Sequence, residues 1–122
     1  MRVAGVVARA VGVVLVLGLA NSASVRAHHG WSGYEGDKPL RLEGTIKEAG
    51  YEHPHGFVQL ETPGKTWLVV LAPPSRMENR GLPRERLKPG THATVEGYPS
   101  RSDPNEMRAE RITVDGKTTE LR

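Results

Sequence analysis

The chain has 122 residues, with 17 Lys and Arg, 14 Asp and Glu, and no cysteine. The lack of cysteine excludes disulfides, thiol catalysis and a lipid-modified amino-terminal cysteine. The length is that of one small domain with a modest core.

The first 27 residues have the pattern of an export signal. Arg2 and Arg9 lie in a positive leading region, an uncharged apolar run covers residues 10–20, and a polar stretch ends at Ala27. We predict cleavage after Ala27 and a periplasmic or secreted protein; Ala20 and Ala23 are alternative cut points. The apolar run is shorter than the roughly 20 residues that a membrane span needs. This length favours a cleaved signal over the alternative, an uncleaved anchor. We therefore expect no stable membrane anchor after cleavage.

Cleavage after Ala27 would leave 95 residues and change the charge balance. Arg2, Arg9 and Arg26 would be lost with the signal, which leaves 14 basic and 14 acidic side chains. Nucleic-acid binding depends on a basic surface. The neutral mature chain therefore argues against a nucleic-acid partner.

The mature chain predicts short strands separated by Pro and Gly turns. We expect residues 28–38 to form an extended leading segment and residues 39–122 to form the folded domain. Over residues 37–51 the apolar positions alternate and then change register, which predicts one strand with a bulge near Lys47–Glu48. After a loop over residues 52–56, strands are expected over 57–61 and 66–71. The second of these is apolar at nearly every position, as in strands covered on both faces.

The second half of the chain predicts one short helix and two more strands. Ser75 and Glu78 form a capping-box pattern after Pro73-Pro74, which predicts a helix to about Arg80 with Gly81 as its stop. Residues 82–88 are ambiguous and compatible with one more turn. Strands are expected over 91–98 and 107–114, and the turn at Asp115-Gly116 predicts a hairpin arm over 117–121.

This order predicts a mainly β fold, a small five-stranded Greek-key barrel of the OB type with one short helix between the third and fourth strands. The bent first strand fits, because a small barrel has to curl its longest strand to close. The alternative is an open antiparallel sheet with one helix. Trp67 is expected in the core. Trp31 and Tyr34 are expected to pin the leading segment to the barrel, and the alternative is that they form an aromatic patch beside the terminus.

Several stretches resemble a family of exported bacterial proteins known as domain of unknown function 6152. They are Ala27-His28-His29-Gly30-Trp31-Ser32, Lys38-Pro39-Leu40, Leu42-Glu43-Gly44-Thr45-Ile46, Pro54-His55, Leu87-Lys88-Pro89-Gly90, Val95-Glu96-Gly97-Tyr98-Pro99, Ala109-Glu110-Arg111 and Asp115-Gly116. The family usually has Asn before the Pro-His pair, where this chain has His53. The resemblance implies an exported, soluble, OB-like domain and brings no activity, substrate or catalytic residue.

Four histidines predict a metal site. Cleavage after Ala27 would give His28 a free α-amine beside its imidazole, and His29 follows it. His53 and His55 lie in the loop after the first strand, which in OB barrels shares an end with the loop after the fourth strand, where ligands usually bind. We place the start of the first strand at the opposite end. The 11 residues from His28 to Pro39 span up to about 35 Å, enough to cross the barrel.

Nitrogen donors of this kind suit Cu(II) best among divalent ions, and Zn(II) next. The alternative is that these histidines bind no metal, with His55 bonded to a backbone carbonyl. His92 is interpreted as part of the fourth strand, at the end opposite the His53 loop.

Three functions follow from these patterns. The first is an exported carrier, buffer or sensor of a divalent metal, which is the reading we favour. The second is an envelope module of the OB type that docks a protein or glycan without metal. The third is a copper monooxygenase or other metalloenzyme, which 95 residues disfavour because they leave little room for a large substrate cleft. No nucleophile elbow or phosphate loop is present, so no catalytic residue is assigned and we expect a protein that is not an enzyme.

Overall fold

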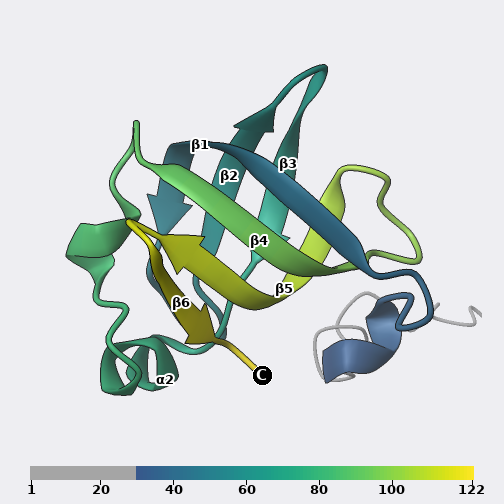
Figure 1. Cartoon of the computed structure of the whole chain (residues 1–122). Helices are drawn as coiled ribbons and strands as arrows, with labels where there is room; N and C mark the ends of the chain where they lie inside the picture. Colours follow the sequence, from purple (N-terminus) through teal and green to yellow (C-terminus); the bar gives the residue numbers. More distant parts are fainter. Residues whose placement is uncertain (1–29) are drawn as a thin grey trace, which may run out of the picture.

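The computed structural model describes residues 30–122 (Figure 1). Its elements, in chain order, are η1 (Gly30–Gly33), β1 (Leu40–Gly50), β2 (Phe57–Thr62), β3 (Lys65–Val70), α2 (Pro74–Asn79), η2 (Arg84–Leu87), β4 (His92–Pro99), β5 (Glu106–Val114) and β6 (Lys117–Glu120). Within these residues, no helix is long and apolar enough to cross a membrane.

The strands form one sheet that closes on itself, which confirms the OB-like barrel (Figure 1). The order is β3-β2-β1-β4-β5-β6, and β3 also pairs in parallel with β5, from Leu68 opposite Glu106 to Val70 opposite Arg108. This extra pairing excludes the open sheet. The Asp115-Gly116 turn has positive φ angles of 51° and 75°, and it adds β6 to β5 as the expected hairpin arm.

The predicted bulge in β1 is present, between Ile46 and Glu48. It lets β1 pair with β4 through its first half and with β2 through its second half. Ile46 is fully buried at this bend, beside Val58, Leu60 and Val95 in the core. The bulge therefore bends the longest strand around the barrel, as its sequence pattern predicts.

The expectation that both faces of β3 are covered is wrong. Val69 is its only fully buried residue, while Trp67 is half-buried and packs against the core with Lys65 Nζ 3.7 Å from the centroid of its ring. An antiparallel sheet commonly has one face on the core and one toward water. The outer face of β3 follows that rule despite its apolar sequence.

The start of α2 also differs from the prediction. The N-cap is Pro73, no side chain caps the helix, and Pro74 occupies the first turn, so Ser75 lies inside the helix. Proline is favoured in the first turn because its fixed φ suits the helix and its missing N–H would be unpaired there. Gly81 ends the helix as expected, with a φ of 84° and its N–H donating to Glu78 O. The ambiguous stretch after it forms the additional turn η2.

The leading segment lies beside the β4–β5 loop. Residues 30–33 form a 3₁₀ turn instead of extended chain, and Tyr34 then bridges to Ser100. Leu40 pairs with Gly97 at the end of β4. The start of β1 is therefore next to the β4–β5 loop, and its expected position at the opposite end was wrong. Antiparallel pairing requires this, since the first residues of β1 must meet the last of β4.

Candidate functional site

A hollow of about 820 Å³ lies between the leading segment and two loops. The β1–β2 loop contributes Pro54 and His55, and the β4–β5 loop contributes its residues 100–104. The other lining residues are Gly30, Ser32, Gly33, Tyr34, Val70, Glu106 and Arg108. The two loops thus meet at one hollow, which confirms that part of the sequence prediction.

His55 is the histidine that reaches this hollow, and it is bonded to Arg108. The distance from Arg108 Nη2 to His55 Nε2 is 3.2 Å. A guanidinium can only donate, so Nε2 accepts and the neutral ring carries its proton on Nδ1. Burial, and then the charges of Arg108 and Arg76, lower the pKa of His55 below its usual value. The surroundings therefore keep this imidazole neutral.

Arg108 is the least expected residue of the site. Its side chain is only 6% exposed, and its Nε is buried without a hydrogen-bond partner among the described residues. All 14 Asp and Glu lie within residues 30–122, and none of the ion pairs there involves Arg108. Burial lowers the pKa of its guanidinium, which nevertheless stays charged. Arg108 is thus a buried cation without a carboxylate partner.

Trp31 joins the leading segment to the barrel next to this hollow. The Arg108 and Arg122 guanidinium carbons lie over its ring, 4.3 and 4.7 Å from the centroid. The rings of Tyr34 and Tyr98 meet the indole edge-on, at centroid distances of 6.4 and 6.0 Å. These contacts confirm that Trp31 pins the leading segment to the barrel.

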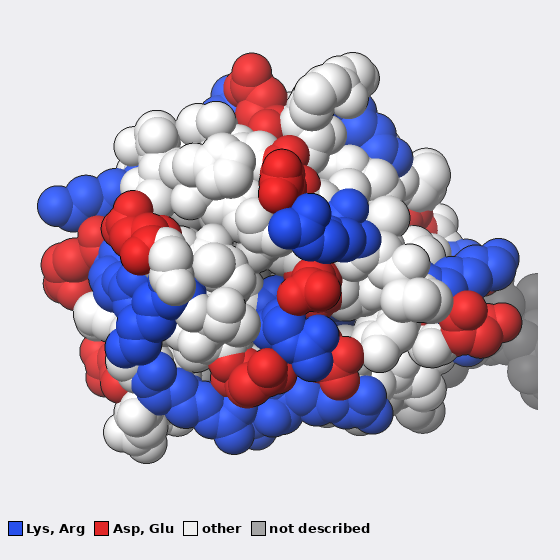
Figure 2. Space-filling model, in the orientation of Figure 1, with Lys and Arg blue, Asp and Glu red and all other residues white. Residues whose placement is uncertain are grey.

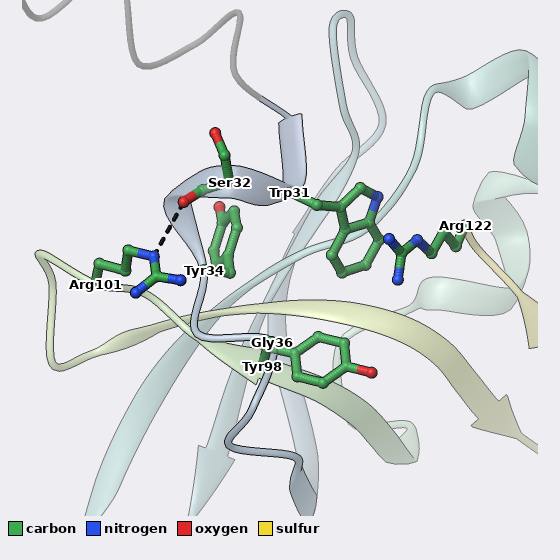
Figure 3. A pocket seen from close by; sticks show the side chains of 7 residues that line it. All are labelled: Trp31, Ser32, Tyr34, Gly36, Tyr98, Arg101 and Arg122. Carbon is green, nitrogen blue, oxygen red and sulfur yellow. Dashed lines mark hydrogen bonds between the residues drawn. The ribbon is translucent and has the colours of Figure 1, made fainter.

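A second hollow of about 450 Å³ lies around the same indole (Figure 3). Figure 3 shows the Trp31 side chain beside the Arg122 guanidinium, with the ring of Tyr98, a residue of β4, near both. The dashed line marks Arg101 Nε donating to Ser32 O at 3.0 Å. Backbone bonds from Arg101 N to Gly33 O and from Glu35 N to Pro99 O hold the same segment. The leading segment is thus fixed to the β4–β5 loop at several points.

Two tyrosines at the site donate to carboxylates. Tyr34 Oη donates to Glu106 Oε2 at 2.8 Å, and Tyr98 Oη donates to Glu110 Oε2 at 3.0 Å. Burial and then the Glu106 bond raise the pKa of Tyr34, and the Glu110 bond raises the pKa of Tyr98. Both hydroxyls therefore stay protonated donors at neutral pH.

The structure describes two of the four predicted metal ligands, and only one of them lines the hollow. His28 and His29 lie outside the described residues, His55 lines the hollow, and His53 is exposed and does not line it. Residues 30–122 contain no group of three or more His, Cys, Asp or Glu that could hold a metal. His92 is exposed and pairs with Thr45 in the sheet, away from the hollow.

Sequence reasoning missed Arg108 and Glu106. Arg108 lies between Met107 and Ala109 in β5, and all three are buried, but charged residues are frequent in this strand and gave no signal that Arg108 turns inward. The register irregularity between β4 and β5 falls at Glu110, after these three residues, and its position cannot be placed from the periodicity of β5 alone.

Charges of both signs are mixed on the surface. On the face drawn in Figure 2, acidic side chains lie among the basic ones, with a run of Lys and Arg along the lower edge. This mixture agrees with the equal numbers of each sign in residues 30–122.

The model of a family of unknown function, DUF6152, matches residues 15–109 of the chain. No curated protein matches the chain. Among solved structures, a complex of TiaS with an isoleucine tRNA and ATP aligns with 73% of this chain and 20% of that chain, at 20% identity and a TM-score of 0.50. Asparaginyl-tRNA synthetase from Pyrococcus horikoshii aligns with 69% of this chain and 20% of that chain, at 17% identity and a TM-score of 0.51. The chain thus spans about a fifth of the length of these proteins, and the likeness shows the fold alone.

Proposed function

The chain belongs to the DUF6152 family, which has no assigned activity, and from its own residues we propose that the mature protein binds a divalent metal, Cu(II) before Zn(II). The proposed ligands are the α-amine and imidazole of His28, with His55 as the third. We propose His29, the next residue of the chain, as the fourth ligand, because His53 does not line the hollow. The proposal includes export and cleavage after Ala27, which create the free amine.

The observation that carries the proposal is that Gly30 and His55 line the same hollow. His29 and His28 are one and two residues before Gly30. Consecutive Cα atoms are about 3.8 Å apart, so the His28 amine cannot be more than about 9 Å from the Gly30 Cα. No long excursion of the leading segment is needed. Imidazole and amine nitrogens favour Cu(II) over other divalent ions in the stability order.

His55 must exchange one partner for another when metal binds. Its ring is neutral, so no proton has to leave to free a lone pair, but Arg108 holds Nε2 in the metal-free protein. The guanidinium also repels a divalent cation. Arg108→Met removes the competing donor and the charge, so we expect copper affinity to rise by roughly tenfold.

Calorimetric titration of copper into the processed protein tests the site. We compare the chain that begins at His28 with a version whose α-amine is acetylated, with His55→Ala, and with His92→Ala as the matched control outside the hollow. Acetylation removes the amine donor beside the His28 ring, and we expect affinity to fall by about 100-fold or more when this chelate is lost. Equal affinity of the acetylated and native chains would disprove the proposal. The intact mass of the protein from the envelope verifies the terminus.

A metal-independent envelope module is the second candidate, and the His55–Arg108 bond favours it, because Nε2 already has a partner without metal. In this function the hollow takes a ligand, or the barrel docks a protein or glycan. Binding that persists in excess chelator and in His55→Ala supports this candidate. Binding that disappears in both supports the metal site instead.

A further inference from the structure

Arg108 has an unusual electrostatic position. Burying a charge costs several kcal/mol unless another charge or several hydrogen bonds compensate it. Its contacts are a neutral imidazole nitrogen and the face of an indole. The guanidiniums of Arg76 and Arg122 add like charge, and each further lowers the pKa of Arg108. A buried cation in these surroundings is stabilised by an anion.

The nearby carboxylates do not supply that anion. Glu106 accepts the Tyr34 hydroxyl, Asp103 accepts the Asn105 N–H at 2.8 Å, and Glu110 lies 3.7 Å from Arg122. Every Asp and Glu of the sequence lies within residues 30–122. The missing anion therefore has to come from outside the side chains of this protein.

Of the three guanidinium nitrogens of Arg108, Nη1 is the one available to an anion. Nη2 is bonded to His55, and Nε is enclosed. Nη1 has no hydrogen-bond acceptor within residues 30–122. It lies 3.9 Å from the position that a Cβ at Gly30 would take. Gly30 therefore lies beside Nη1, and both residues line the hollow. We propose that the hollow binds a small organic carboxylate through Arg108.

The walls of the hollow favour a monoanion with an apolar part. Val70, Pro54 and Pro104 present apolar surface, and about 820 Å³ is ample for a small organic molecule. Asp103 and Glu106 also line the hollow, so a dianion such as phosphate would be repelled more strongly than a carboxylate. A carboxylate oxygen accepts from a guanidinium in a short, charge-assisted bond.

The experiment uses the full mature chain with its α-amine acetylated, in excess chelator, so that the proposed metal chelate is absent. Butyrate, acetate and inorganic phosphate are titrated at constant ionic strength, with the Arg108 Nε–H and Gly30 amide signals followed by NMR. Butyrate should give saturable shifts of both signals, and phosphate should bind more weakly.

Arg108→Met should weaken butyrate binding by about tenfold or more, because a hydrogen bond to a charged group contributes roughly 1.5–3 kcal/mol. Arg108→Lys should recover part of the affinity. Arg111→Met, on the same strand but outside the hollow, is the matched control and should match the native chain. The amide spectrum of each variant verifies that it is folded.

The inference is overturned if butyrate gives no saturable shift, if Arg108→Met and Arg108→Lys both bind as the native chain does, or if phosphate binds more tightly than butyrate. The inference rests on described residues alone, so it is separable from the metal proposal. Copper binding without butyrate binding contradicts only this inference, and the reverse result contradicts only the metal site.

Discussion

His55 and Arg108 show how one neighbour sets the chemistry of a side chain. In the unfolded chain the imidazole has a pKa of about 6.5. In the fold, burial and then the charges of Arg108 and Arg76 lower that pKa. Between the two values the unfolded state binds a proton that the folded state does not. The neutral ring therefore costs the folded protein stability as the pH falls through about 6.5.

We expect His55→Gln to reduce this dependence on pH. The usual pKa of histidine is about 6.5. The free energy of unfolding of the native chain should decrease as the pH falls from about 7.5 through this value, toward the lowered pKa of His55. The glutamine variant should lose less over the same interval, since it has no proton to take up. Urea unfolding at several pH values, in chelator, measures both curves. His53→Gln, at an exposed position of the same loop, is the control. If His55→Gln has the same slope as the native chain, the lowered pKa is wrong.

Among secondary-structure elements, the leading segment depends on one side chain. Trp31 meets two guanidiniums and two tyrosine rings, while the backbone bonds of Tyr34, Glu35 and Arg101 fix the chain around it. A short segment with so few buried residues has little stability of its own. We therefore expect the indole to contribute much of its order, beside these backbone bonds.

Trp31→Ala should release the leading segment without opening the barrel. We expect a loss of about 1–3 kcal/mol from the cation–π and aromatic contacts. Hydrogen exchange should become faster at the amides of Glu35 and Arg101, whose acceptors lie across the joint between this segment and the β4–β5 loop. The amides of β2 serve as the internal reference. Unchanged exchange at Glu35 would show that the backbone bonds suffice.

Gly97 is the residue that allows β4 to approach β5 at the register irregularity. A Cβ there would collide with the backbone carbonyl of Arg108, which cannot move as a side chain could. Gly97→Ala should destabilise the protein by about 1–3 kcal/mol, as overpacking usually does. Gly36→Ala is the matched control, because nothing lies within 4 Å of its Cβ position, and it should change stability by less than about 0.5 kcal/mol. Urea unfolding measures both, and equal effects would contradict the argument.

The elements themselves could largely be predicted from the sequence. The change in apolar register placed the bulge of β1, and the Asp115-Gly116 dipeptide placed the β5–β6 hairpin. The start of α2 was wrong because a proline in the first turn overrode a capping pattern one residue later. Capping depends on which residue enters the helix first, and Ser75 and Glu78 match the pattern wherever the helix begins.

At the scale of the whole molecule, the order of strands was enough to predict the barrel but not the composition of the site. The metal candidates were found because histidine is rare and chemically distinctive. Arg108 was not, because its role depends on the parallel pairing of β3 with β5, which brings Val70 opposite it. Pairings between strands far apart in sequence leave no local pattern. For the same reason the start of β1 was placed at the wrong end of the barrel.

The neutral charge of the described chain gives a prediction about nucleic acid. The structures that share its fold include a tRNA complex, yet residues 30–122 carry as many acidic as basic side chains. With no excess of basic over acidic side chains, we expect counterion release to contribute little to binding. We expect no shift of tRNA in a gel at physiological salt, about 0.15 M, with the mature protein in micromolar excess. A salt-dependent shift under these conditions would contradict the expectation drawn from charge.

The position of Trp31 has a consequence for the connectivity of the chain. Its indole contacts Arg122, so the first and last described residues lie close together on the barrel. Neighbouring termini at the surface tolerate circular permutation. A short Gly-Ser linker could join residue 122 to residue 30, and new ends could be opened at the exposed Pro63-Gly64 turn, where no strand is broken. Such a permutant would keep every strand pairing, and its leading segment would be joined to the rest of the chain at both ends.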